Sequence, residues 1–443
     1  MKRLVPILLV LVLLLGCAPT GTPVEAVWEA GFGSAELPLP TEDGGPLYIA
    51  GYRNGKEITG VLDLQQARAL WLSDGRTAMV LIAVDCVGLG SDTVARIRDG
   101  LADFCRRTGC DSVNVISTHT HAGVDTLGLW GPVGLNGKNE AFMDILVAGA
   151  IRAAEDAYGD RSRGTLQWAT TKTEGLQEDS RLPEKYDSNI YQIRFQPEDP
   201  NQNGIRLWSF GAHAEALRSE NTKVSRDYPG VVCDIIHRET GDDGLFVPGA
   251  IGGLIMTPRL KENVEENLQV TGQWIANRVL ADTKWTDLTP DLAVSRVEWE
   301  TELDNTLFMY YKFLGILGNP ARQDLLGRYY LTTEVSVVRL GALGLTLVPG
   351  ELFPELVQGT GKAEDPQGIA ALGQAYGLEK MLILGLANDE IGYIVPPSDF
   401  VLDEELPYVQ EAEGDHYEET NSVGPNCAAD LVRALEEALK KLK

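Results

Sequence analysis

The sequence is poor in histidine, in basic residues and in long apolar runs. It has five histidines in 443 residues, and its 38 Lys and Arg face 64 Asp and Glu, giving a formal net charge of −26. A surface this acidic repels nucleic acid and anionic lipid headgroups, so nucleic-acid binding is not expected. After residue 16, no run is long and apolar enough to form a transmembrane helix.

Cysteine is also scarce, and the six cysteines include no C-x-x-C pair. The sequence therefore gives no support to a thiolate zinc site or a thioredoxin-like centre. Cys105 and Cys110 are close enough in the chain for a short-loop disulfide at a helix end. Five cysteines remain besides Cys17, so at least one thiol stays free unless it pairs between molecules.

The N-terminus has the pattern of a bacterial lipoprotein signal. Met1–Arg3 is short and positive, and residues 4–16 are mostly apolar but too short to span a bilayer. Leu14-Leu15-Gly16-Cys17 resembles a lipobox, in which the chain is cut before a cysteine that is then lipidated. We therefore expect export and attachment through Cys17 to a membrane surface, on the periplasmic or extracellular face of the cell envelope. The alternative is an ordinary secretory signal cut after Ala18.

The expected organisation is a signal peptide over residues 1–16, a lipid-anchor cysteine and flexible tether over 17–34, and one large catalytic domain over 35–443. Residues 77–85 and 111–117 have strand patterns, and an amphipathic helix with Ser91 as its N-cap separates them. This order predicts parallel pairing and an α/β fold with a mixed β-sheet core and flanking helices. Further strands are expected at 166–171, 190–195, 205–213, 292–303 and 335–349, and helices at 140–158, 264–280 and 427–442.

Two of the five histidines, His119 and His121, stand one residue apart directly after the predicted strand 111–117. A strand has a period of two, so both side chains are expected on one face. Strand ends are where α/β proteins build metal and catalytic sites. From spacing alone, a metal site and two structural polar residues at a strand edge are about equally supported.

Two residues farther along the chain could complete a zinc site, which needs three or four nitrogen or oxygen ligands and one position open to water. His213 ends the predicted strand 205–213, and Glu351 follows an apolar strand and a Pro-Gly turn. An acid at the start of a following helix would also suit the helix dipole. From sequence pattern alone, this helix-terminal role is the favoured interpretation of Glu351.

Five short motifs stand in the same order as in the neutral/alkaline (non-lysosomal) ceramidase family. The first three are these: Thr118–Gly123 resembles T-H-T-H-[SA]-G, Trp208–His213 resembles N-W-F-A-x-H with the tryptophan one residue early, and Pro349–Glu351 resembles P-G-E. Two follow: Ala387–Tyr393 resembles A-N-x-Y-x-x-Y, and His416–Glu418 with Gly424-Pro425 resembles H-Y-E-G…G-P. Each motif is weak alone, but their order across residues 118–425 makes the chain similar to a divergent member of this family.

The resemblance implies an exported zinc hydrolase that cleaves the amide bond of an N-acyl, ceramide-like substrate through a metal-bound water. In the family, the residues that match His119, His213, Glu351 and Tyr393 hold Zn²⁺. The expected partners of the protein are therefore a small-molecule or lipid-like acyl amide and, through Cys17, a membrane surface.

The resemblance also implies three catalytic residues. The residue that matches His121 lies beside the metal and handles protons or holds the attacking water, and the tyrosine that matches Tyr417 donates a hydrogen bond to the substrate oxyanion. Arg181 lies in Ser180–Pro183, a loose match to an N-R-S-P segment whose arginine lines the site. A surface salt bridge is an equally supported role for Arg181.

The chain departs from the family pattern on the substrate side. Residues 249–258 keep a glycine-rich turn but lack the acid and the serine of the family's G-D-x-S-P, and Thr257 is the nearest hydroxyl. Glu390 stands where the family has the first tyrosine of A-N-x-Y, and the C-terminal β domain of many relatives is not expected after Lys443. The apolar segment 307–314 could line an acyl channel, although such segments are more often core helices.

Two alternative functions remain open. One is a zinc hydrolase of the same fold that acts on a different amide or ester. The other is a lipoprotein that binds a ligand without turnover, and the presence of all four expected metal ligands argues against it.

Overall fold

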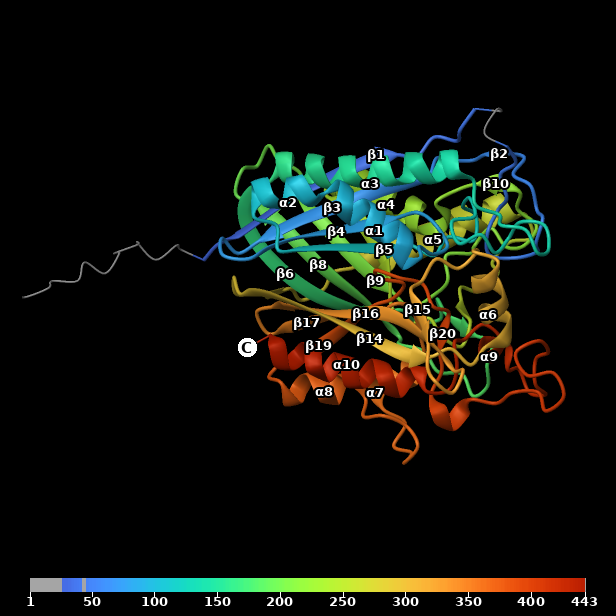
Figure 1. Ribbon diagram of the computed structural model, residues 1–443. Coiled ribbons are helices and arrows are strands. Elements are labelled where there is room, and N and C mark those ends of the chain that lie inside the picture. The colour runs from blue at the N-terminus through green and yellow to red at the C-terminus, as the bar shows by residue number, and fades with distance from the viewer. Residues whose placement is uncertain (1–25, 42–44, 443) are drawn as a thin grey trace, which may run out of the picture.

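The computed structural model describes residues 26–41 and 45–442, and two β-sheets packed face to face form its centre (Figure 1). Within these residues the larger sheet has nine strands, in the order β11-β9-β8-β6-β1-β3-β4-β5 with β13 paired to β6. Its strands are β1 (Trp28–Glu36), β3 (Gln66–Ser73), β4 (Ala78–Val84), β5 (Ser112–Ser117), β6 (Ser162–Lys172), β8 (Asn189–Pro197), β9 (Ile205–Phe210), β11 (Asp243–Pro248) and β13 (Thr286–Asp287). The pairs β4–β5 and β9–β11 are parallel and the other pairs are antiparallel.

The smaller sheet has the order β14-β16-β17-β19, with β15 paired to β16, and only β17–β19 is parallel. Its strands are β14 (Leu292–Glu302), β15 (Ala321–Gln323), β16 (Tyr329–Leu340), β17 (Leu343–Leu347) and β19 (Lys380–Leu384). Three short strand pairs lie outside the two sheets: β2 (Gly60–Val61) with β10 (Lys223–Val224), β7 (Glu178–Asp179) with β12 (Ile255–Met256), and β18 (Glu351–Leu352) with β20 (Tyr393–Ile394).

Helices cover both outer faces, so the molecule has four layers in the order α-β-β-α (Figure 1). The larger sheet is covered by α1 (Ser91–Gly100), α2 (Ala102–Thr108), α3 (Glu140–Asp160), α4 (Asp227–Thr240) and α5 (Val264–Val279). The smaller sheet is covered by α7 (Pro354–Gln358), α8 (Ile369–Ala375) and α10 (Cys427–Lys441). The remaining helices are α6 (Thr306–Phe313), η2 (Pro397–Asp399) and α9 (Tyr417–Thr420).

The apolar runs of the sequence become strands that are buried on both faces. In β4, Met79 and Leu81 pack against the smaller sheet, whereas Val80 and Ile82 pack against α1 and α3. A strand between a sheet and a helix layer needs apolar side chains at every position, which is why these strands do not alternate with polar residues. Each such buried aliphatic side chain stabilises the fold by about 1.5–3 kcal/mol.

The predicted α/β class with a mixed-sheet core and flanking helices is confirmed, and so is the parallel β4–β5 pair joined by helices. The helix between these two strands begins one residue earlier than predicted and is divided in two. Ser91 is the first residue of α1 rather than its N-cap, which is Gly90, and the helix breaks at Leu101 before α2. Cys105 and Cys110 are neighbouring free thiols.

The predicted tether over residues 17–34 is wrong at its C-terminal end. Residues 28–34 belong to β1, which pairs with β3 on one side and β6 on the other. The predicted signal peptide, Cys17 and the tether up to residue 25 lie outside the described residues. Among the helices of the described part of the chain, none is long and apolar enough to cross a membrane.

Candidate metal centre

The candidate site lies where the carboxyl ends of strands from both sheets meet. His119 follows β5 and His213 follows β9, both in the larger sheet, while Glu351 follows β17 of the smaller sheet. The two sheets are tied together beside these residues. The Ser117 amide donates to the Leu386 carbonyl at 3.1 Å, and the Asn388 amide donates to the Val115 carbonyl at 2.7 Å.

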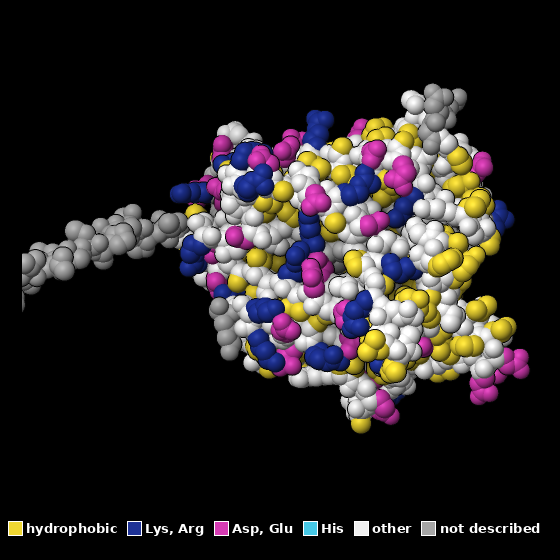
Figure 2. Space-filling model, viewed as in Figure 1, with side chains coloured by type: hydrophobic (Ala, Val, Ile, Leu, Met, Phe, Trp, Pro, Cys, Tyr) yellow, Lys and Arg dark blue, Asp and Glu magenta, His cyan; other side chains and the backbone are white. Residues whose placement is uncertain are grey.

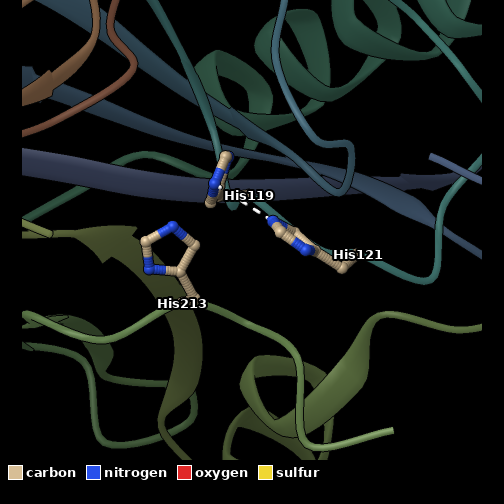
Figure 3. A group of neighbouring side chains, drawn as sticks. All are labelled: His119, His121 and His213. Carbon is tan, nitrogen blue, oxygen red and sulfur yellow. Dashed lines mark hydrogen bonds between the residues drawn. The ribbon is translucent and has the colours of Figure 1, made fainter. Parts of the chain in front are cut away.

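His119 and His121 meet through a turn and not through strand alternation. The strand β5 ends at Ser117, and His119 has a φ of 62°, in the left-handed region. Strand periodicity is therefore the wrong reason for expecting the two side chains on one face. The two side chains nevertheless converge, with 3.2 Å between their Nε2 atoms, and His213 lies beside them (Figure 3).

Two of the imidazoles are held in the same way by backbone carbonyls. His119 Nδ1 lies 2.6 Å from the Val87 oxygen, and His213 Nδ1 lies 2.8 Å from the Ile255 oxygen. A carbonyl can only accept, so Nδ1 carries a proton in both rings and Nε2 faces inward, where it can bind a metal ion when it carries no proton. Glu351 Oε2 lies 2.9 Å from His213 Nε2 and 3.6 Å from His119 Nε2.

His121 faces a carboxylate and not a carbonyl. Its Nδ1 lies 3.4 Å from Oε2 of Glu215 and has no hydrogen-bond partner among the described residues, and that oxygen accepts the Tyr52 hydroxyl at 2.7 Å. Gly51, with a φ of +100°, packs so closely that a Cβ there would overlap the His121 ring. Glu215 and Tyr52 were not predicted. Glu215 stands two residues after His213, which is the one signal in the sequence for it.

The donor set fits a metal ion of the zinc type. His119, His121 and His213 each offer a ligand nitrogen within 4.8 Å of the others. Burial lowers the pKa of His119 to about 3 and also lowers the pKa of His121, so both are neutral at pH 7. Neutral imidazole lone pairs that converge in a buried space, beside a carboxylate, repel one another unless a cation lies between them, and borderline metals such as zinc favour these ligands.

Glu351 supplies the negative charge of the site. Burial alone would raise the pKa of its carboxyl, but His119, His213 and a hydrogen bond from Tyr393 lower it. Burial would lower the pKa of His213, but its hydrogen bond with Glu351 raises it. Glu351 begins the short strand β18, and the next helix, α7, starts only at Pro354, so the favoured helix-terminal interpretation of Glu351 is wrong.

The two predicted tyrosines stand side by side at the site. The parallel pairing of β18 with β20 sets Tyr393 opposite Glu351, and the Tyr417 ring lies 6.2 Å from the Tyr393 ring, edge to face. Burial raises the pKa of Tyr417 to about 12 and also raises the pKa of Tyr393 well above its usual range. Both hydroxyls are therefore protonated, and able to donate, at neutral pH.

Arg181 is not brought to this cluster. Its buried guanidinium is bound to Glu418 at 2.8 Å, to Glu419 at 2.9 Å and to the Asp399 carboxylate at 3.2 Å, and it lies 3.0 Å from His416 Nδ1. These contacts attach Arg181 to the segment that carries Tyr417. The geometry agrees with the salt-bridge alternative, although the ion pairs are buried and not on the surface.

A cavity of about 940 Å³ opens onto the site. Five of the predicted residues line it, namely His119, His121, Glu351, Tyr393 and Tyr417. Much of the remaining wall is apolar, and it includes Leu127, Trp130, Leu254, Met256, Phe308, Leu331 and Val423. On the surface, apolar side chains gather over the loops around α6 and around β2 and β10 (Figure 2).

The substrate-side segments also contribute to this cavity. The region 249–258, where the family's serine is missing, supplies Leu254 and Met256, whereas Thr257 is buried outside the lining. In the segment 307–314, Phe308 lines the cavity and Phe313 is 88% exposed. This segment is the helix α6, whose Phe308 belongs to the core of the smaller sheet and also lines the cavity, and whose C-terminal end is exposed.

The protein thus belongs to the class of α/β proteins in which two mixed sheets pack face to face. Its imidazoles and a carboxylate lie where the two sheets are joined, in a buried site that could hold a metal ion. Two solved structures share this fold. The neutral ceramidase from Pseudomonas aeruginosa superposes with a TM-score of 0.73 at 14% identity, over 94% of this chain and 74% of that chain. A ceramidase complexed with C2 gives a TM-score of 0.69 at 15% identity, over 94% and 75%.

The chain therefore has the neutral ceramidase fold, and the predicted resemblance is confirmed at the level of the fold. The sequence itself is divergent. No protein-family model matches it, and no curated protein matches it by sequence.

Proposed function

We propose that this protein is a zinc-dependent hydrolase that cleaves the amide bond of an N-acyl, lipid-like compound. The observation that carries the proposal is the convergence of three imidazoles and Glu351, of which His119, His121 and Glu351 line a large, mainly apolar cavity. The fold shared with two ceramidases supports amide hydrolysis as the reaction.

The proposed ligands are His119, His213, Glu351 and Tyr393. The first two have their Nδ1–H groups bound to carbonyl oxygens, which is the usual outer support of a metal-binding histidine. When bound, zinc would polarise the amide carbonyl and lower the pKa of a water molecule to about 7. Tyr393 reaches the site through its hydrogen bond to Glu351.

The proposed catalytic residues are His121 and Tyr417. His121 faces the carboxylate of Glu215, an arrangement that stabilises an imidazole while it takes up a proton and passes it to the leaving amine. Tyr417 lines the cavity with a protonated hydroxyl, which is able to donate a hydrogen bond to the developing oxyanion.

The proposed substrate has a long apolar acyl group. The volume of about 940 Å³ lies at the upper end of the range for small-molecule sites, and its apolar wall would accept hydrocarbon. One of the two structural neighbours is described as complexed with C2, and both are ceramidases. The missing family serine argues for a substrate whose polar part differs from that of ceramide.

We also propose that the protein is an exported lipoprotein anchored at Cys17, on the basis of the Leu14–Cys17 pattern. Labelled palmitate supplied to expressing bacteria should be incorporated into the wild type and not into Cys17→Ala. Equal labelling of both chains would contradict the anchor, and a soluble exported protein cut after Ala18 would support the ordinary secretory signal.

The central experiment measures bound zinc and turnover in the same preparation. The wild type should bind about one zinc ion per chain and release fatty acid from some of a panel of N-acyl sphingoid bases, simple acyl amides and esters. His119→Ala and Glu351→Ala should lose both zinc and activity. His237→Ala is the matched control, because His237 is an exposed histidine paired with Asp243.

Each outcome of this experiment has a distinct meaning. Absence of zinc, or equal zinc in His119→Ala and Glu351→Ala, would contradict the metal centre. Turnover of esters alone would favour a hydrolase of another specificity. Bound zinc without turnover of any amide or ester would favour a ligand-binding lipoprotein.

A further inference from the structure

Glu390 is a buried carboxyl group to which the proposed function gives no role. Its side chain lines the same cavity as His119 and Glu351, and only 9% of the residue is exposed. Oε1 accepts the Gly392 amide at 2.9 Å, whereas Oε2 is buried and has no hydrogen-bond partner among the described residues. A buried polar atom without a partner is unfavourable, so its presence on the cavity wall calls for a ligand.

Contacts fix both the backbone and the side chain of Glu390. Its amide donates to Asp389 Oδ1 at 3.0 Å, and Asp389 in turn accepts from Asn319 and Thr333. Gly88 makes room for it, because a Cβ at Gly88 would lie 2.8 Å from Glu390 Cγ. The carboxyl group is therefore held at the wall and cannot turn out to solvent without breaking these contacts.

The surroundings of Glu390 determine which chemical group it could bind. The neighbouring wall is apolar, with Phe308, Leu331 and Ile391 in the lining. Burial raises the pKa of Glu390, and the charges of Glu351 and Asp389 raise it further. The free oxygen can accept a hydrogen bond from a hydroxyl group, and a carboxyl group that keeps its proton can also donate one, so a hydroxyl group fits Oε2 in either protonation state.

We propose that Glu390 is a substrate-binding residue whose Oε2 forms a hydrogen bond with a hydroxyl group next to the scissile amide. The substrate is then an N-acyl amino alcohol, and a plain N-alkyl amide is a poor substitute. A pocket that hydrogen-bonds a substrate hydroxyl rejects the analogue without it, because the polar group of the protein would stay unpaired. The selection of substrate by Glu390 depends on the amide hydrolysis proposed above.

The test compares two amides that differ by one hydroxyl group, N-dodecanoylethanolamine and N-ethyldodecanamide, on the zinc-loaded protein. For the wild type, kcat/KM should be about tenfold higher for the hydroxylated amide, the effect of one net hydrogen bond. Glu390→Leu should remove this preference, whereas Glu390→Gln should keep most of it. Glu298→Gln, a change at an exposed carboxylate on β14, is the control.

The outcomes separate this proposal from the proposed function. Equal kcat/KM for the two amides in the wild type, or an unchanged preference in Glu390→Leu at normal zinc content, would overturn the role of Glu390. If the wild type cleaves neither amide, calorimetric binding of the same two amides tests the role of Glu390 instead, and the proposed function fails only if no other amide of the panel is cleaved either. If the wild type binds N-dodecanoylethanolamine more tightly than N-ethyldodecanamide and Glu390→Leu does not, the proposed role of Glu390 is supported. Equal or undetectable binding of both amides contradicts that role.

Discussion

The three imidazoles of the site differ in what their Nδ1 atoms face. His119 and His213 each face a backbone carbonyl, which cannot accept a proton at neutral pH, whereas His121 faces the Glu215 carboxylate. A carboxylate stabilises an imidazolium ion much more strongly than a carbonyl does, because the two groups carry opposite full charges. His213 also faces a carboxylate, Glu351, but through Nε2, the nitrogen that is proposed to bind the metal ion. His121 is therefore the imidazole of this group that is left to carry a proton when the metal ion is bound.

The first prediction concerns Glu215→Gln, which removes the charge behind His121. We expect kcat to fall by about 10- to 100-fold, the usual cost of losing an outer partner of a site histidine, with zinc content unchanged. Tyr52→Phe is the milder comparison, because it leaves the carboxylate in place. Kinetics on the best substrate of the panel, with zinc measured in parallel, would check this. Loss of zinc in Glu215→Gln would instead make His121 a metal ligand.

The second prediction concerns Tyr417→Phe, which removes a hydroxyl that lines the cavity beside Tyr393. A donor aimed at the oxyanion acts in the transition state, so kcat should fall by about 100-fold while KM changes little. Tyr310→Phe, at a half-exposed tyrosine of α6, is the matched control and should leave both constants unchanged. A raised KM with normal kcat would show that Tyr417 only binds the substrate.

At the scale of elements, Arg181 joins three parts of the chain. It lies just after β7 and contacts Asp399 at the end of η2 and both Glu418 and Glu419 in α9. Removing one partner of a buried ion pair leaves the others uncompensated. Arg181 therefore acts on the site by holding the segment that carries Tyr417.

The third prediction follows from these contacts. Arg181→Ala should lower the free energy of unfolding by about 3 kcal/mol, measured by urea denaturation. Arg433→Ala, at a surface pair with Asp430 in α10, should change it by less than about 0.5 kcal/mol. A stable Arg181→Ala protein that has lost its activity would contradict this structural role and favour the direct catalytic role.

Elements with a strong local pattern were predictable from the sequence, and those shaped by distant contacts were not. The run at 78–84 is apolar at every position, so β4 was evident, whereas β1 contains Gly31 and Gly33 and was assigned to a tether. These glycines are needed because α3 crosses β1 closely, and a Cβ at either position would overlap the helix backbone. The cause lies more than 100 residues away and leaves no local trace.

Some residues of the site were predictable from the sequence and others were not. The order of the motifs led to His119, His121, Glu351 and Tyr393, although strand periodicity gave the wrong reason for the histidine pair. Tyr52 and Glu215 escaped prediction, because their roles arise only when loops from distant parts of the chain meet His121. Side chains that support other side chains have no spacing rule along the sequence.

At the scale of the molecule, the site depends on both sheets being complete. The larger sheet brings His119 and His213, the smaller sheet brings Glu351, and β1 lies near the middle of the larger sheet. Trp28, at the start of β1, is 2% exposed, and its Nε1 donates to the Leu288 carbonyl at 2.7 Å. Residues assigned to a tether by sequence thus belong to the layer that carries two of the histidines.

The last prediction compares two shortened chains, one beginning at residue 26 and one at residue 38. The first should unfold cooperatively and bind zinc like the parent chain. The second should show no cooperative transition, because without β1 the strands β3 and β6 lose their shared partner. A typical domain is stable by only about 5–15 kcal/mol, and Trp28→Ala alone should cost about 3–5 kcal/mol. Cooperative folding of the chain from residue 38 would show that the fold does not depend on β1.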